Sequence, residues 1–182
     1  MPQPISLETE RLRLRPWRRS DLVPFAYINA DPDVMRYFPS TLSAEESDAV
    51  AERIIAHFDT HGFGFWAVEV PGGPEFIGFV GLNHCLPPLP FVPAVEIGWR
   101  LATAHQGLGY ATEAAQSALD FAFDSLRLNE IVAYTTVNNT PSRNVMHKLG
   151  MTRDPRDDFG HPRIPTHHPL HPHVVYRVRS PR

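Results

Sequence analysis

The sequence predicts a single mixed α/β domain over residues 1–182. Three observations lead to this fold class. Hydrophobic residues make up 42% of the chain and aromatic residues 10%, enough to bury one sizeable core. Runs of period-two alternation and runs with helical spacing both occur, and they follow the order strand, two helices, several strands, then helix, strand, helix, strand. No internal repeat or linker-like segment divides the chain.

The first strand is expected at residues 11–15. Arginine and leucine alternate there, so Leu12 and Leu14 would face the core. The strand should end at Pro16, which has no N–H for a strand ladder.

Two helices should follow this strand. Residues 21–30 predict a short helix with Ser20 as its N-cap, and residues 33–38 add a turn. The segment Ser43-Ala-Glu-Glu46 has the pattern of a capping box, and apolar residues recur every four positions after it. We therefore expect a helix of roughly 18 residues with one buried face.

The middle of the chain predicts strands. Residues 65–70 and 76–82 are strand-like and flank Pro71-Gly-Gly-Pro74, which indicates a hairpin. A proline-rich loop at 87–93 leads to a further strand at 95–101.

The last third alternates helix and strand. Small and apolar residues after residue 110 share one helical stripe: Ala111, Ala114, Ala115, Ala118, Leu119, Ala122 and Leu126. Residues 131–137 predict a strand, and residues 141–149 a short helix that stops at Gly150. Residues 152–173 indicate mostly loop, and 174–178 a final strand.

Composition excludes several classes of protein. The formal net charge of −3 leaves no basic footprint, so we expect no nucleic-acid partner. No apolar run approaches the roughly 18 residues of a membrane span, and the start Met1-Pro-Gln-Pro-Ile-Ser6 lacks the pattern of a signal peptide. A cytoplasmic protein without membrane partners is expected. The single cysteine, Cys85, excludes an intrachain disulfide and a cysteine-based zinc cluster.

Gly107 and Gly109 stand directly before the long helix expected after residue 110. A glycine-rich turn that opens a helix presents unpaired backbone N–H groups at the positive end of the helix dipole, a site suited to phosphate. A plain tight turn explains the same spacing. The Gly-Lys-Ser/Thr of a Walker loop is absent, and the third glycine and early position of a Rossmann fingerprint are absent too.

Further segments give this loop a context. Gln106-Gly-Leu-Gly-Tyr-Ala111 resembles the pyrophosphate loop of GNAT acetyltransferases. Glu96-Ile-Gly-Trp-Arg-Leu101 resembles the splayed fourth strand of that family. The family's Asn-x-x-Ser…Lys-Leu-Gly-Phe segment resembles Asn139-Thr-Pro-Ser-Arg-Asn-Val-Met-His-Lys-Leu-Gly-Met151. The opening Leu7-Glu-Thr-Glu-Arg-Leu-Arg-Leu-Arg15 is similar to the branch of ribosomal-protein N-terminal acetyltransferases of the RimJ and RimL type. The resemblance covers about residues 7–178.

The resemblance implies a mostly antiparallel sheet that is splayed at strand 4 and flanked by helices. It implies acetyl-CoA as co-substrate. The spacing of the histidines, interrupted by prolines, leads us to expect no metal. The pantetheine arm would lie along Trp99 and Leu101, and Asn139 would form a hydrogen bond with it. The backbone around the pyrophosphate would come from Gln106, Gly107, Leu108, Gly109, Tyr110, Ala111 and Thr112.

Acetyl transfer to an amine needs a group that takes the amine proton. Glu96 is the candidate base, acting directly or through water, and a solvent-facing strand glutamate is the alternative. A backbone N–H within residues 97–99 would polarise the carbonyl. Many family members place a tyrosine general acid where this chain has Met146, so Ser142 is the candidate substitute. Ser142 has a second interpretation, as the cap of the short helix, and a thiol of pKa about 8.5 leaves with little help.

Other reactive residues favour structural roles. Cys85 with His84 as base would give a ping-pong mechanism, but neighbours on a strand point to opposite faces. Glu113 suits the first turn of a helix, where a carboxylate complements the dipole. The histidines at 161, 167, 168, 171 and 173 are interrupted by prolines, so we expect loop packing around the acceptor pocket and not a metal site.

The resemblance implies an N-acetyltransferase that moves an acetyl group from acetyl-CoA directly to a primary amine in a ternary complex. The acceptor is a protein N-terminus or a small-molecule amine, and the protein is a monomer or a homodimer. The alternative function, motivated by Met146, is an acyl-CoA-binding or sensor module that has lost catalysis.

Overall fold

The computed structural model of the protein describes residues 5–181, and the expected domain limits at residues 1 and 182 lie outside this range. So do Met1 to Pro4 of the N-terminal stretch, which was expected to lack a signal peptide. The strands are β1 (Leu7–Glu8), β2 (Arg13–Arg15), β3 (Phe65–Glu69), β4 (Gly78–His84), β5 (Val95–Leu101), β6 (Glu130–Thr136), β7 (Thr152–Arg153), β8 (Phe159–Gly160) and β9 (Pro172–Arg179). The α-helices are α1 (Leu22–Ala30), α2 (Ala44–His61), α3 (Tyr110–Asp124) and α4 (Thr140–Lys148).

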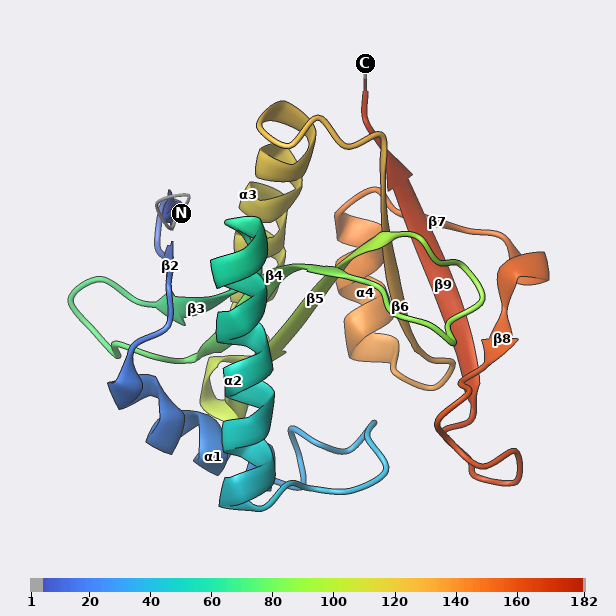
Figure 1. Cartoon of the computed structure of the whole chain (residues 1–182), viewed down its shortest axis with the longest axis horizontal. Helices are drawn as coiled ribbons and strands as arrows, with labels where there is room; N and C mark the ends of the chain where they lie inside the picture. The colour runs from blue at the N-terminus through green and yellow to red at the C-terminus, as the bar shows by residue number, and fades with distance from the viewer. Residues whose placement is uncertain (1–4, 182) are drawn as a thin grey trace.

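The described strands form one sheet in the order β1-β2-β3-β4-β5-β6-β9-β7, with β8 paired to β9 (Figure 1). Every pair is antiparallel except β5 and β6. Strand β5 pairs with β4 along its whole length, from Val95 to Leu101, but meets β6 only where Glu96 lies beside Val132. The two parallel strands therefore part beyond Glu96, as the sequence predicts.

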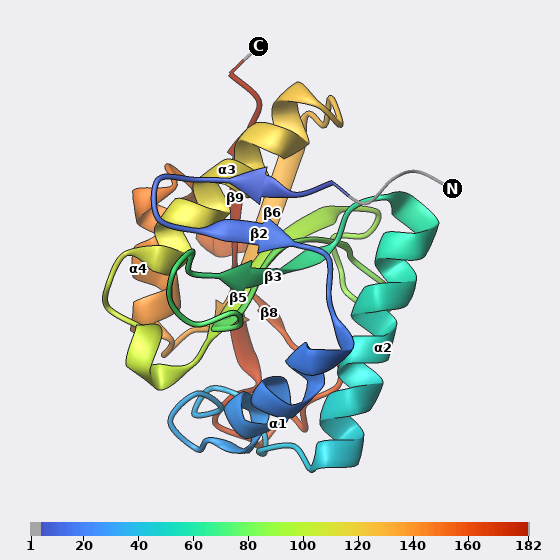
Figure 2. The same ribbon diagram turned by 90° about the vertical axis from the view of Figure 1, so that its left-hand side faces the viewer.

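Helices cover both faces of the sheet. Figures 1 and 2 show α1 and α2 on one face and α3 and α4 on the other. The alanine stripe of α3 is buried: Ala114, Ala115, Ala118 and Ala122 have no exposed surface, so the helix lies close against the sheet. Together with the strand order, this arrangement confirms the predicted mixed α/β fold.

The first predicted strand is shorter than expected. Residues 9–12 form a turn instead, because the Thr9 N–H donates to the Leu12 carbonyl (2.9 Å) and the Leu12 N–H donates to Thr9 Oγ1 (3.0 Å). The turn places β1 against β2 and leaves only residues 13–15 as strand. Leu12 and Leu14 are nevertheless buried, as predicted.

The predicted cap of the next helix is wrong. Ser20 lies inside a short 3-10 helix, Arg19–Asp21, and α1 begins after Asp21. Asp21 is almost fully buried, and its carboxylate accepts the Arg18 N–H (2.7 Å) and two bonds from Arg15 (2.8 and 2.9 Å). A buried ion pair of this kind needs both partners, and it fixes the chain here in place of a serine cap.

The start of α2 agrees with the prediction from its local sequence. The Glu46 N–H donates to Ser43 Oγ (3.1 Å) and the Ser43 N–H donates to the Glu46 carboxylate (2.8 Å), which completes the predicted capping box. The helix spans 18 residues and ends at Gly62, which adopts a left-handed φ of 75°.

The C-terminal segment contains more structure than the loop expected there. Two short strands, β7 and β8, pair with β9, which satisfies backbone groups of a proline-rich stretch that has little helical or strand propensity of its own. Within residues 5–181, no helix combines the length and the apolar character of a membrane span.

Candidate active site

The loop before α3 has the open geometry that phosphate binding needs. Gly107 and Gly109 adopt φ values of 72° and 84°, in the left-handed region that favours glycine. Gly109 is the N-cap of α3, and no side chain caps that end of the helix. Residues 106–109 are exposed, so the backbone N–H groups that begin α3 face solvent at the positive end of the dipole.

Glu113 in the first turn of α3 has a structural role. Its carboxylate accepts bonds from Thr9 Oγ1 (2.6 Å), the Arg11 N–H (2.8 Å) and Arg11 Nε (2.7 Å). The Arg11 guanidinium also lies 4.7 Å from the centre of the Tyr110 ring and donates to the Leu108 carbonyl (3.1 Å). The N-terminal turn of the protein thus supports the glycine loop, a contact that joins residues about a hundred positions apart and that no local pattern predicts.

Strand β5 contacts the core through its side chains and has one edge that is paired only in part. Trp99 is half-buried and Leu101 packs in the main core, while the Leu101 carbonyl accepts a bond from Gln106 Nε2 (2.9 Å). Beyond Glu96 the β6-facing edge of this strand has no β partner among the described residues. A free edge of this kind can pair with an extended amide-bearing ligand.

Asn139, and not Ser142, caps α4. Its Oδ1 accepts the Ser142 N–H (3.2 Å) and its Nδ2 donates to Thr135 Oγ1 (2.9 Å). The capping interpretation of Ser142 is therefore wrong: within residues 5–181 its hydroxyl has no hydrogen-bond partner and is free to meet a ligand. Met146 is 1% exposed and packs in the core, so this position offers no acid.

A cavity of about 600 Å³ opens between α2, the ends of β4 and β5, and the loop after β8. Its polar and charged lining includes Arg53, His57, His61, Asn83, His84, Glu96, Arg100, Tyr134, His161 and Arg163. The loop that carries His161 and Arg163 forms one wall of this cavity. Glu96 lies in this cavity and at the vertex where β5 and β6 part.

Protein atoms surround the Glu96 side chain although part of it faces the cavity. This burial raises the pKa of Glu96 to about 7, against the opposing effect of hydrogen bonds from Asn83 and Tyr134. Asn83 Nδ2 lies 3.0 Å from Glu96 Oε1. The carboxyl is therefore held near the pH at which it can exchange a proton in either direction.

Arg100 is the second charged group of the cavity. Its Nη1 donates to Asn29 Oδ1 (2.6 Å), and its guanidinium lies 4.4 Å from the centre of the Phe38 ring. No carboxylate pairs with it in the described part of the chain, and its buried Nε has no hydrogen-bond partner. Burial lowers the pKa of Arg100 to about 10, which leaves the cation in place at neutral pH.

Cys85 does not have the properties of a nucleophile. Its side chain is buried, and burial raises the pKa of the thiol to about 12. A thiol of this kind stays protonated and unreactive at neutral pH.

Of the histidines in the C-terminal segment, His173 and His161 pack against each other with tilted rings whose centres are 4.8 Å apart. The His171 Nδ1 forms a hydrogen bond with the Ile164 carbonyl oxygen (2.7 Å). These are packing contacts, as expected. Asn83, Tyr134 and Arg100 also line the cavity but were not predicted from the sequence. The one available signal was the alternation of β5, which places Arg100 on the same face as Glu96.

A family model described as the acetyltransferase (GNAT) domain matches residues 11–152. The chain belongs to the GNAT acetyltransferase family. The uncharacterized N-acetyltransferase YnaD of Bacillus subtilis is 31% identical over 81% of this chain and 83% of its own length. The uncharacterized N-acetyltransferase p20 of Bacillus licheniformis is also 31% identical, over 82% of this chain and 83% of its own.

Solved GNAT structures share the fold. An acetyltransferase from Agrobacterium tumefaciens has a TM-score of 0.78 and 31% identity, covering 96% of this chain and 94% of the other. The ribosomal-protein-S5-alanine acetyltransferase of Vibrio fischeri has a TM-score of 0.75 at 18% identity, covering 97% of each chain, and is similar in fold. Membership of the family supports acetyl transfer as the activity.

Proposed function

We propose that this GNAT protein is an acetyl-CoA-dependent N-acetyltransferase that passes the acetyl group directly to a primary amine in a ternary complex. The observation that carries the proposal is the position of Glu96. It lies where β5 and β6 part and lines the cavity at the same time, so one carboxylate borders both the strand opening and the acceptor space.

Acetyl-CoA would bind along the loop before α3 and the free edge of β5. The N–H groups of residues 106–112 would bind the pyrophosphate of acetyl-CoA, which supplies the thioester. The free edge of β5 at Trp99 and Leu101 would pair with the pantetheine amides. Asn139 would hold the same arm with its remaining amide hydrogen, since its other bonds fix α4.

Glu96 would take the proton of the acceptor, directly or through water. A primary alkylamine is mostly protonated at neutral pH, and a base with a pKa near the working pH is the most effective one. The pKa of about 7 matches this requirement. A backbone N–H within residues 97–99 would stabilise the developing oxyanion, and the free hydroxyl of Ser142 would donate to the leaving sulfur.

Arg100 favours an acceptor that carries an anionic group as well as an amine. A buried guanidinium without a carboxylate partner is costly unless a ligand supplies the charge, and this one lines the cavity on the same face of β5 as Glu96. A peptide with an acidic residue near its N-terminus and a small amino acid both meet this requirement.

Thiol release from acetyl-CoA with a panel of amines and peptide N-termini tests the proposal. Turnover with at least one amine is expected. Binding of acetyl-CoA without turnover on any acceptor would favour the acyl-CoA-binding module that Met146 suggests. We further propose that residues 1–182 act as one domain in the cytoplasm.

A further inference from the structure

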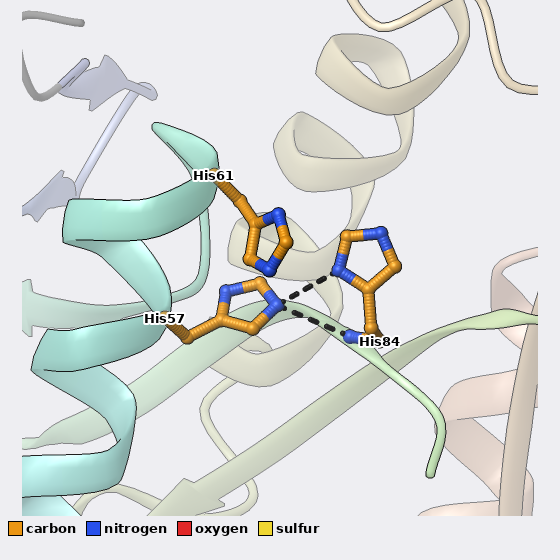
Figure 3. A group of neighbouring side chains, drawn as sticks. All are labelled: His57, His61 and His84. Atoms are coloured by element: carbon orange, nitrogen blue, oxygen red, sulfur yellow. Dashed lines mark hydrogen bonds between the residues drawn. The ribbon is translucent and has the colours of Figure 1, made fainter. Parts of the chain in front are cut away.

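Three histidines converge at the α2 side of the cavity. His57 and His61 stand one helical turn apart in α2, so they share a face of the helix, and His84 is the last residue of β4. Figure 3 shows the three rings turned toward one another. One ring nitrogen from each lies within 4.8 Å of the others, and the ring centres are 4.4 to 5.2 Å apart.

The hydrogen bond from His57 to the Phe63 carbonyl fixes a tautomer that can bind a metal ion. The His57 Nδ1 lies 2.8 Å from the Phe63 carbonyl oxygen, which can only accept, so Nδ1 carries the proton. Nε2 therefore carries the lone pair, which accepts the backbone N–H of His84 at 3.3 Å. A ring nitrogen that donates to a carbonyl while the other faces the site is the usual outer-shell arrangement of a metal-binding histidine.

His57 Nε2 points at His84, 3.0 Å from Nδ1 of that ring (Figure 3). A shift of the His84 proton to its outer nitrogen frees Nδ1 without loss of a proton from the protein.

We propose that His57, His61 and His84 bind one divalent transition-metal ion of the Zn²⁺ type, with the fourth coordination position open to the acceptor cavity. Imidazole nitrogen suits Zn²⁺, Ni²⁺ and Cu²⁺ and not the oxygen-seeking Mg²⁺ or Ca²⁺. Three protein ligands with one open position is the arrangement of an accessible zinc site and not of a closed structural one.

The geometry needs a small adjustment on binding. Zn–N bonds of about 2.0–2.1 Å place tetrahedral ligand atoms roughly 3.3 Å apart, closer than the widest separation in this cluster. His61 can supply the movement because its side chain is exposed at the last turn of α2, directly before Gly62. A bound ion would join the end of α2 to the end of β4.

Calorimetry of the untagged, chelator-treated full chain with ZnCl₂ tests the site, together with thermal unfolding. We expect one ion per chain and, at a hundred times the dissociation constant, a rise in Tm of about 5–10 °C. His61→Ala is the main variant because the side chain is exposed, and it should weaken binding at least tenfold, as should His84→Asn. His167→Ala is the matched control, since it removes an exposed histidine elsewhere.

The proposal is overturned if the wild-type chain binds no Zn²⁺, or if His61→Ala and His84→Asn bind it as tightly as the wild type does. Loss of binding in a His161→Ala variant, with the other two unaffected, would place the ion in the C-terminal loop and overturn it too. Because the titration contains no acetyl-CoA, its outcome is independent of whether the protein transfers acetyl groups.

Discussion

Replacement of Glu96 by glutamine tests the proposed base most directly. With a pKa of about 7, Glu96 is ionised in about a tenth of molecules at pH 6 and about nine tenths at pH 8, so kcat/KM should rise with pH through an inflection near 7. General bases contribute about 10²–10⁴-fold. We expect Glu96→Gln to lower kcat by about that factor at pH 8, with unchanged acetyl-CoA affinity and without the inflection near pH 7.

Stability gives a second measure of the same group. The pKa of Glu96 rises from 4.5 to about 7 on folding, so the unfolded chain ionises first, and the free energy of unfolding should fall as pH rises from about 4.5 through 7. The shift corresponds to up to about 3 kcal/mol above pH 7. Denaturant unfolding at pH 5 and pH 8 should show this loss in the wild type and a smaller one in Glu96→Gln.

Glu45→Gln is the matched control, because Glu45 is exposed in the first turn of α2, far from the parted strands in sequence. It should change neither profile. If Glu96→Gln retains wild-type turnover and the inflection near pH 7, Glu96 is not the base. If Glu96→Gln removes the loss of stability between pH 5 and pH 8 but leaves turnover unchanged, the carboxyl is buried as described but takes no part in proton transfer.

Three further predictions concern the other parts of the site. Gly109→Ala and Gly107→Ala force a residue with a Cβ into left-handed backbone, and each should weaken acetyl-CoA binding by tenfold or more in calorimetry. Gly73→Ala is the control, because Gly73 has no positive φ, and it should leave the affinity unchanged. Equal affinities in all three variants would refute the role of the loop. Arg100→Gln should raise KM for amines that carry a carboxylate and leave neutral amines unchanged; an equal effect on both would remove Arg100 from acceptor recognition. Ser142→Ala should lower kcat by less than about tenfold at pH 8, because a thiolate leaves with little assistance, and a larger loss would mean that protonation of the sulfur limits the rate.

Where one stretch of sequence carries its own signal, the prediction and the structure agree. The capping box at Ser43 fixes the start of α2, and the β-branched and aromatic run at 95–101 gives β5 the expected bounds. Prediction failed where a buried side-chain contact determines the helix start. Ser20 is a good cap by type, but the buried Arg15 and Asp21 ion pair sets the start of α1 instead.

The candidate site shows the same division. Glu96 and the glycine loop are motifs within single segments, and they could be found before the fold was known. The three clustered histidines could not, because His57 and His61 lie about 25 residues before His84 and meet it only when α2 packs over the end of β4. Their spacing alone describes one face of a helix.

Strand β5 shows how one short segment can serve three purposes. Its alternation places Glu96 and Arg100 toward the cavity, while Ile97 and Leu101 enter the core on the other face. Gly98 stands between the two charged residues, and a Cβ there would lie 3.1 Å from the Phe65 ring that lines the cavity.

The bare backbone at Gly98 therefore leaves room for the Phe65 ring, which lines the cavity beside the acid and the cation. Besides the cavity face and the core face, β5 has an edge that no longer pairs with β6 beyond Glu96. In the proposed function, one strand would supply the face for the acceptor and the edge for acetyl-CoA. The direction of the strand would then fix the angle at which the two substrates meet, with Glu96 at their junction.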